Sequence, residues 1–439
     1  MVGRPGRTGR RGGRGWQESA ASRASAHRRI VYSPVVHLSS YARSPLTRRR
    51  LHRIALPCAL LAALTGTLTA VLADGDAPAP AISRVGRLLV PTAVAAPADP
   101  SAPPSVAILA TPPGAARTTL HIAPIGGAKA GPALATLRHL SDAVVRARVV
   151  PRTRLVVATA ETSPSSDRSF NASLFRIQPG AEPVALCDGV VHASRPLVTA
   201  EGRVFVSRGV AGPEPRPDND PARLRVDALT IDEVDLATGA IRTVHRHTGH
   251  LAFLADAWNG ELVLYRVSPA SADIVLVDPD SGATRVIAPS IPPFARDFSI
   301  DAAAGALVFQ ERHETDPGLW VIDRIDLARG KRTRLGASAS HGLAPYAWPG
   351  GGLAYTPERA TGLFVVGARA AIRSPLGPGV DAIQAVSQDA AWVAALHTNP
   401  SAFAVPFAIR VESGEVATIP APPGARIAVA GFTAAKEGP

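Results

Sequence analysis

Three histidines lie close together in the sequence, at His245, His247 and His250. Alternate side chains of a β-strand point to the same face, so His245 and His247 would share a face and a turn would bring His250 near them. Imidazole nitrogens are common ligands of transition metals, which makes these three residues the candidate metal site of the chain. The same spacing fits an outer strand with solvated histidines, and we prefer that interpretation.

Other residue patterns give weaker signals for chemistry. Asp218, Asn219 and Asp220 could supply oxygen ligands to calcium, but no Gly and Glu follow at the spacing of a calcium-binding loop, so we expect a solvated loop. The sequence contains no G-x-S-x-G, no Gly-rich phosphate loop followed by a helix and no H-E-x-x-H. Cys58 and Cys187 are the only cysteines, which excludes a cysteine-based zinc site. We therefore expect no catalytic residues and no cofactor.

A repeated hairpin must position whatever site the chain has. Its turn carries Asp at the end of one strand and Gly four residues later. The three clearest copies are VDLATGAIRTV (234–244), VDPDSGATRVI (277–287) and IDLARGKRTRL (325–335). Asp accepts hydrogen bonds from the amides of the turn, and Gly adopts the left-handed conformation from which the next strand leaves.

The repeats recur at a nearly constant distance along the chain. The predicted second strand of each unit begins near Val106, Leu155, Val204, Leu262, Leu307, Leu353 and Trp392. The gaps run from 39 to 58 residues. Four short strands per unit at this period are typical of a β-propeller blade. Two packed sheets without a central axis are the competing fold.

The two ends of the repeat region complement each other. The N-terminal unit, 106–137, has only three predicted strands, and one spare strand, 427–432, lies near the C-terminus. Joining them in one blade removes exposed sheet edges. We therefore predict an all-β, seven-bladed β-propeller of four-stranded antiparallel blades over 105–432, with a tail at 433–439. Six and eight blades stay open as alternatives.

The repeat resembles the WD40-like propeller of TolB-type periplasmic proteins. The resemblance is carried by the turn and strand SIDAAAGALVF (299–309) and by the Asp-x-x-x-Gly turns that follow such strands. It covers about 105–432 and implies a fold without implying a function.

A propeller commonly binds its ligands at the mouth of the central channel. We expect this mouth to be formed by loops that precede the innermost strands and loops that join the second and third strands. The predicted binding residues in these loops are Asp167, Arg168, His313, Glu314, Asp316, His341, Glu358, Arg359, His397 and Asn399.

The charge of the chain is concentrated at one end. Residues 1–53 hold thirteen Arg and one acidic residue, Glu18, whereas the rest holds 34 basic and 34 acidic residues. A nucleic-acid-binding fold needs its basic residues on the folded domain. We therefore expect no nucleic acid as a partner and interpret 1–53 as a disordered basic tail. Because Met1 is the only methionine, a misassigned start stays open.

An apolar segment follows the basic tail. Residues 54–73 contain no charge and are long enough to span a bilayer, and four arginines precede them within six positions. We predict either a single apolar transmembrane helix or a signal peptide cleaved after Ala73. Residues 47–51 (TRRRL) resemble a twin-arginine export signal. An Ala/Pro-rich linker, 74–104, leads to the repeats.

These features indicate a protein outside the cytoplasmic membrane, soluble or anchored by one helix. We expect a binding or scaffold module for a protein or envelope component, not an enzyme. The alternative is a propeller-fold hydrolase or lactonase with a metal in the central channel, which would need at least three oxygen ligands converging on one point.

Overall fold

The computed structural model describes residues 103–434 except for short internal gaps at 163–169, 192–193, 212–225, 248–250, 269–270, 293–294, 303, 341, 350–351, 358–361, 367–371, 373–375 and 400–403. Within these ranges every regular element is a β-strand, and no helix long and apolar enough to cross a membrane is found there. The predicted basic tail, apolar segment and nearly all of the linker lie outside the described residues, as do Asp218, Asn219 and Asp220.

The first sheet joins the two ends of the repeat region. Its order is β27-β1-β2-β3, with β27 (Arg426–Thr433) paired antiparallel to β1 (Ser105–Thr111), followed by β2 (Arg117–Pro124) and β3 (Ala135–Arg138). Ser105 pairs with Thr433 and Thr111 pairs with Arg426. The predicted closure by a C-terminal strand is therefore confirmed.

The second sheet contains eight strands. One half is formed by β4 (Arg146–Val149), β5 (Val156–Glu161), β6 (Ala172–Ile177) and β7 (Val184–Val190). The other half is formed by β8 (Leu197–Val198), β9 (Val204–Ala211), β10 (Val226–Val234) and β11 (Ile241–His247). A single residue pair, Val190 with Arg208, joins the halves through β7 and β9.

Four smaller sheets complete the chain. The strands of the first two are β12 (Leu251–Trp258), β13 (Glu261–Val267), β14 (Ala272–Val277), β15 (Thr284–Ile291), then β16 (Arg296–Asp301), β17 (Ala306–Arg312), β18 (Trp320–Asp326) and β19 (Arg332–Ala339). The strands of the last two are β20 (Tyr346–Trp348), β21 (Gly352–Tyr355), β22 (Phe364–Val366), then β23 (Val380–Val386), β24 (Trp392–Thr398), β25 (Ala404–Arg410) and β26 (Val416–Thr418).

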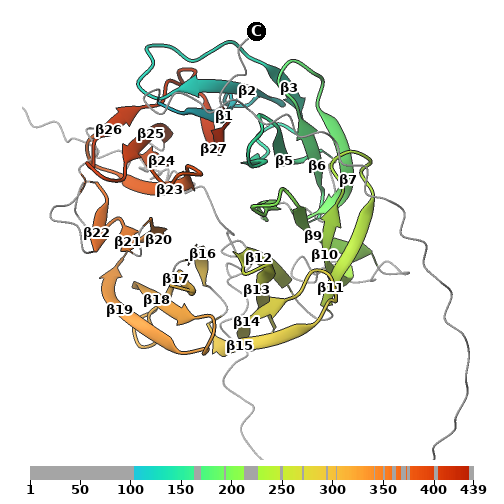
Figure 1. Ribbon diagram of the computed structural model, residues 1–439, viewed down its shortest axis with the longest axis vertical. Coiled ribbons are helices and arrows are strands. Elements are labelled where there is room, and N and C mark those ends of the chain that lie inside the picture. Colours follow the sequence, from blue (N-terminus) through green and yellow to red (C-terminus); the bar gives the residue numbers. More distant parts are fainter. Residues whose placement is uncertain are drawn as a thin grey trace, which may run out of the picture.

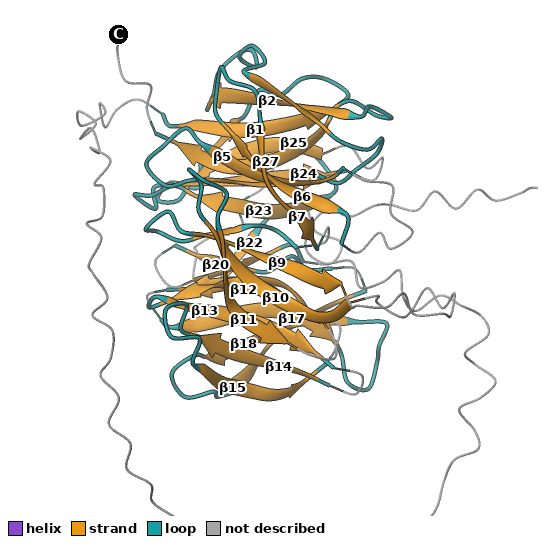
Figure 2. Ribbon diagram, turned by 90° about the vertical axis from the view of Figure 1, so that its right-hand side faces the viewer, coloured by secondary structure: helices purple, strands orange, loops and turns teal. Residues whose placement is uncertain are grey.

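The sheets are arranged around a common axis, with β12, β16, β20, β23 and β27 nearest the centre (Figure 1). Seen from the side, the ring is shorter along its axis than across it (Figure 2). This radial arrangement of antiparallel sheets is that of a β-propeller, and the competing fold of two packed sheets is wrong. All seven predicted second strands begin within one residue of the expected position.

Apolar side chains fill the spaces between neighbouring sheets. The largest cluster of buried residues includes Phe253 and Tyr265 from one sheet and Phe309 from the next. The ring of Phe298 lies between them, with centroids 5.0 Å from Tyr265 and 5.5 Å from Phe309. Face-to-face packing of the sheets therefore places their inner edges around the axis, and this fixes the position of the site described below.

The Asp-x-x-x-Gly turns have the predicted local chemistry. In the first of them, Asp235 Oδ1 accepts hydrogen bonds from the amides of Ala237 (2.9 Å) and Thr238 (2.7 Å), and Gly239 has a φ of 74°. In the third, Gly330 has a φ of 70° and lies against the carbonyl oxygen of Ile287 in the neighbouring sheet. Gly330 thus serves both the turn and the packing of two sheets.

We expect Gly330→Ala to destabilise the protein more than Gly336→Ala. Both glycines have positive φ, 70° and 66°, so each alanine costs about 1–2 kcal/mol in backbone strain. Only at Gly330 would the new methyl group also collide with a backbone oxygen, since nothing lies within 4 Å at Gly336. Equilibrium unfolding in urea checks this, and equal losses would show that sheet-to-sheet contact at Gly330 is unimportant.

Candidate binding site on the propeller axis

Two arginines project from the inner edge of the second sheet. Arg146 and Arg148 are two residues apart on β4 and so share a face of the strand, whereas Ala147 between them belongs to an apolar cluster. Arg146 is only 8% exposed. A third arginine, Arg195, lies just before β8.

Side chains cross the axis at this level. Arg148 Nη1 donates to the backbone oxygen of Gln384 at 2.7 Å, and Arg195 Nη2 donates to Gln384 Oε1 at 2.8 Å. Gln384 belongs to β23, in a sheet that is separated from β4 by the first sheet (Figure 1). The axis is therefore bridged by hydrogen bonds between sheets that are not neighbours.

Two half-buried carboxylates face these arginines. Asp256 of β12 accepts hydrogen bonds from the amides of Ala257 (2.9 Å) and Ile300 (3.3 Å), which ties β12 to β16. Burial raises the pKa of Asp256, while the Ala257 amide and the charges of Arg148 and Arg195 oppose the shift. The carboxylate is thus held in place but poorly solvated.

The second carboxylate, Asp297, lies near the start of β16. Burial raises its pKa to about 6, against the lowering effects of Arg296, a hydrogen bond from Gln310 and Arg146. Its backbone has a φ of 57°, which is unusual for a residue other than glycine. Such strain at a half-buried carboxylate is typical of a position held for a polar contact.

Arg296 is fixed by stacking. Its guanidinium lies 3.8 Å from the ring centroid of Trp320, and Arg312 lies 3.9 Å from the same centroid. A Cβ added to Gly342 would come within 2.6 Å of Arg296 Nη2. Contacts between guanidinium groups and an indole are favourable, so Arg296 is held beside Asp297 without a strong ion pair.

Not all of the axial donors are satisfied. Arg146 Nε and Nη1, Arg195 Nε and Ser194 Oγ are buried and have no hydrogen-bond partner among the described residues. Burial lowers the pKa of Arg146 to about 10, and Asp297 partly offsets this. Burial also lowers the pKa of Arg195, as do the charges of Arg148 and Arg146.

We call these residues the axial cluster: Arg146, Arg148, Arg195, Arg296, Asp256 and Asp297. In the described part of the chain it contains four guanidinium groups and two carboxylates. Its charge is therefore suited to an anion and repels a metal cation.

Three of the predicted mouth residues form a turn between β17 and β18. His313 Nδ1 accepts from the amides of Thr315 and Asp316, both at 3.3 Å, and Asp316 Oδ1 accepts from the amide of Gly318 at 3.0 Å. Glu314 lies 3.5 Å from Arg334 as an exposed ion pair. These contacts shape the loop, and the structure brings the three residues together.

The prediction that His397 lies in a loop is wrong. His397 is in β24, is 1% exposed, and its Nδ1 lies 2.7 Å from Oδ1 of the buried Asp381. Asn399 follows directly after that strand and is half-buried. Asp167, Arg168, His341, Glu358 and Arg359 lie outside the described residues.

The candidate metal site is described only in part. His245 and His247 lie on β11, the outer edge of its sheet, and pair with Ile231 and Leu229 in register. Burial, with the charges of Arg266 and His247, lowers the pKa of His245. No group of three or more potential ligands is found where the structure describes the chain, and His250 lies outside it.

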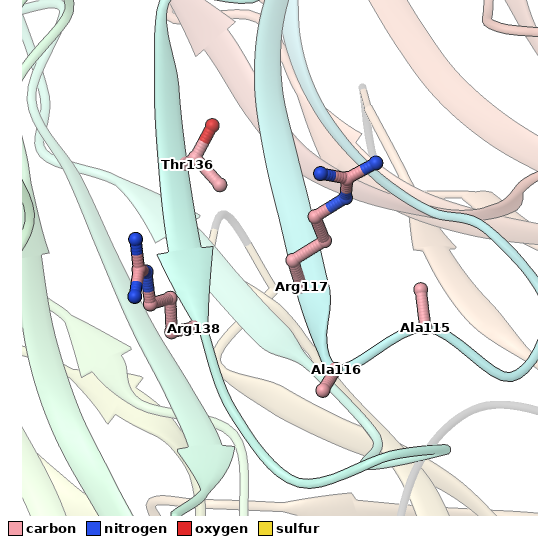
Figure 3. A pocket seen from close by; sticks show the side chains of 5 residues that line it. All are labelled: Ala115, Ala116, Arg117, Thr136 and Arg138. Carbon is pink, nitrogen blue, oxygen red and sulfur yellow. The ribbon is translucent and has the colours of Figure 1, made fainter.

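A surface hollow lies on the first sheet, away from the axis. It is lined by Ala115, Ala116, Arg117, Thr136 and Arg138, and Figure 3 shows the two arginines projecting from neighbouring strands. Arg117 and Arg138 are register partners on β2 and β3, and both are exposed. The hollow is shallow and lacks buried polar groups, so it does not form an enclosed site.

Comparison with known proteins supports the fold and gives no information about function. No family model matches the chain, and no curated protein matches it. Among solved structures, TolB from Acinetobacter baumannii is 13% identical, with a TM-score of 0.43 over 75% of this chain and 67% of that one. A nidogen/laminin complex is 14% identical, with a TM-score of 0.39 over 75% of this chain and 97% of that one.

A structure from a study of two prolyl endopeptidases is 14% identical, with a TM-score of 0.47 over 74% of this chain and 50% of that one. The expected resemblance to TolB-type propellers is confirmed as a likeness of fold. At these identities the likeness carries no information about ligands or chemistry.

Proposed function

We propose that this chain is a seven-bladed β-propeller that acts outside the cytoplasmic membrane as a binding module for a protein or an envelope component. The number of blades follows if the eight-stranded sheet counts as two blades, because in the described part of the chain its halves share strand pairing at one position, Val190 with Arg208. The three-stranded sheet β20-β21-β22 then counts as one incomplete blade.

The charge of the axial cluster is the observation that favours binding over metal-dependent hydrolysis. The alternative requires at least three oxygen ligands converging on a cation in the channel. Among the described residues, the axis instead carries guanidinium groups that cross to Gln384, and Asp256 already accepts two backbone amides. A divalent cation there would be repelled by more positive than negative groups.

Site-specific crosslinking in the source organism tests the binding role. A photoreactive amino acid would replace Glu314, at the mouth, or Val286, which is 51% exposed on the outer strand β15. We expect a discrete adduct with an envelope component from position 314 and none from position 286. Equal labelling from both positions, or none from either, would contradict the proposal.

The location outside the membrane is proposed from the arginine-flanked apolar segment, 54–73. A fusion protein tests this location. The reporter enzyme is joined to the C-terminus of the chain and is active only after export. Activity that disappears when 54–73 is deleted supports export, whereas activity that is absent from the full-length fusion contradicts it.

A further inference from the structure

Two arginines of the axial cluster, Arg146 and Arg195, lie beside Ser194, and all three residues have buried donors without a hydrogen-bond partner among the described residues. Arg146 on β4 is the register partner of Thr159 on β5. Thr159 Oγ1 donates to the backbone oxygen of Ser194 at 3.4 Å, and Ser194 directly precedes Arg195. Arg146, Ser194 and Arg195 therefore meet at the inner edge between the two halves of the eight-stranded sheet.

The burial of these donors makes their lack of partners costly. Arg146 is 8% exposed and Ser194 is 3% exposed, yet Arg146 Nε and Nη1 and Ser194 Oγ have no hydrogen-bond partner among the described residues. Burying a charge without compensation is strongly unfavourable. A sequence that places two guanidinium groups and a hydroxyl in this position needs a negatively charged group to complete the site.

The surrounding charges do not supply that group. The neighbouring Arg148 donates to a neutral backbone oxygen, and Arg195 Nη2 donates to a neutral amide. Asp256 and Asp297, the two carboxylates of the axial cluster, are opposed by four arginines. Net positive charge thus remains at the inner edge.

We propose that Arg146, Ser194 and Arg195 form a binding site for a phosphate-type oxyanion on the propeller axis. Guanidinium groups donate hydrogen bonds in a planar fork that matches the oxygens of such an anion. The hydroxyl of Ser194 adds a neutral donor. Ser194 and Arg195 lie just before β8, so the site is on the mouth side of the axis. Phosphate binding is measured without a protein partner, so its failure is distinguishable from a failure of partner binding.

Titration of inorganic phosphate into the full-length chain, followed by calorimetry at constant ionic strength with chloride as reference, tests the proposal. We expect saturable binding of one phosphate per chain and a higher melting temperature with phosphate than with chloride. Glycerol 3-phosphate is the second ligand. Its binding would indicate that a phosphate ester can enter, and binding of inorganic phosphate alone would indicate a site for the free ion.

Two variants distinguish phosphate binding at this site from phosphate binding to surface arginines. Arg146→Gln should lower the affinity for phosphate about tenfold or more, because charge-assisted hydrogen bonds are lost. Without phosphate it should not lower the melting temperature, since an unpaired buried charge is removed. Arg138→Gln, in the surface hollow, should leave the affinity unchanged (Figure 3).

Arg195→Gln provides a second variant if Arg146→Gln does not fold, and we expect a similar loss of affinity. The absence of saturable phosphate binding to the wild type would overturn the proposal. So would unchanged affinity in either folded variant, or a loss of affinity in Arg138→Gln as large as that in Arg146→Gln.

Discussion

Deleting residues 426–439 should abolish cooperative folding. The deletion removes β27, which pairs with β1 at seven positions from Ser105 to Thr111. β27 also carries Val429 (0% exposed) and Ala430 (1% exposed) into two apolar clusters. Burial of each large apolar side chain contributes roughly 1.5–3 kcal/mol, against a total stability of about 5–15 kcal/mol for a typical domain.

The deletion would also expose a template for aggregation. β1 would become an edge strand with unpaired amides and carbonyls, and six of its seven residues are buried in the intact protein. We therefore expect loss of the cooperative transition in thermal unfolding and large species in size-exclusion chromatography. A monomer with the wild-type melting temperature would show that the ring does not depend on this closure.

Two further measurements make the interpretation specific. Deleting only 435–439 leaves β27 and the hydrogen bond from the Ala434 amide to the Thr153 oxygen (3.1 Å), so the melting temperature should not change. A synthetic peptide of residues 426–434 should rescue the longer deletion by adding a strand to β1. Failure of both the control and the rescue would locate the defect elsewhere.

The architecture was predictable because its signals are local and repeated. Each Asp-x-x-x-Gly turn marks a hairpin through contacts within five residues, as in Asp235 to Gly239. The period of the hairpins then fixes the ring. The spare strand at the C-terminus was recognisable because the first unit lacked a strand, and β27 fills that place.

The axial cluster was not predicted because its members are far apart in the sequence. Arg146, Arg195, Asp256 and Asp297 come from different units, and nothing in their spacing connects them. The available signal was weak: two arginines at alternate positions in Arg146-Ala147-Arg148, at the start of a strand that otherwise packs in the core. Only closure of the ring brings these residues to one axis.

Some of the predicted mouth residues have structural roles that the sequence did not reveal. Polar residues at predicted loop positions were interpreted as binding groups, yet His313 and Asp316 accept backbone amides and so build their own turn. His397 was placed in a loop because β24 runs two residues further than the apolar pattern suggests. It is instead a buried partner of Asp381.

Asp297 should make the protein less stable as the pH rises from about 4 to about 6. Burial raises the pKa of this carboxyl from 3.8 to about 6, so the folded state holds its proton over a range in which the unfolded state has lost it. Stability falls with pH wherever the folded state binds more protons than the unfolded state. The difference of about two pKa units corresponds to about 3 kcal/mol.

The comparison of the wild type with Asp297→Asn isolates this effect from the other carboxyls. Urea unfolding between pH 3 and pH 7 should show the free energy of unfolding of the wild type falling relative to the variant by about 3 kcal/mol as pH rises. Asp278→Asn provides a control of opposite sign, because a hydrogen bond from the Asp280 amide and another from the Ser281 hydroxyl lower the pKa of Asp278. There the wild type should gain stability relative to the variant as pH rises, with most of the change below pH 4.

A parallel pH dependence for wild type and Asp297→Asn would mean that Asp297 has the same pKa in the folded and unfolded protein and is therefore ionised in the folded protein above about pH 4. The axial cluster would then carry one more negative charge at pH 5 than its burial implies, and Arg146 would be better compensated. The expected fall with pH instead means that ionised Asp297 is poorly accommodated even beside Arg296, because burial outweighs the attraction of the neighbouring cation. An anion bound at Arg146 would repel the ionised Asp297 carboxylate and raise its pKa further. Phosphate should therefore raise the pH at which the stability of the wild type, measured relative to Asp297→Asn, falls.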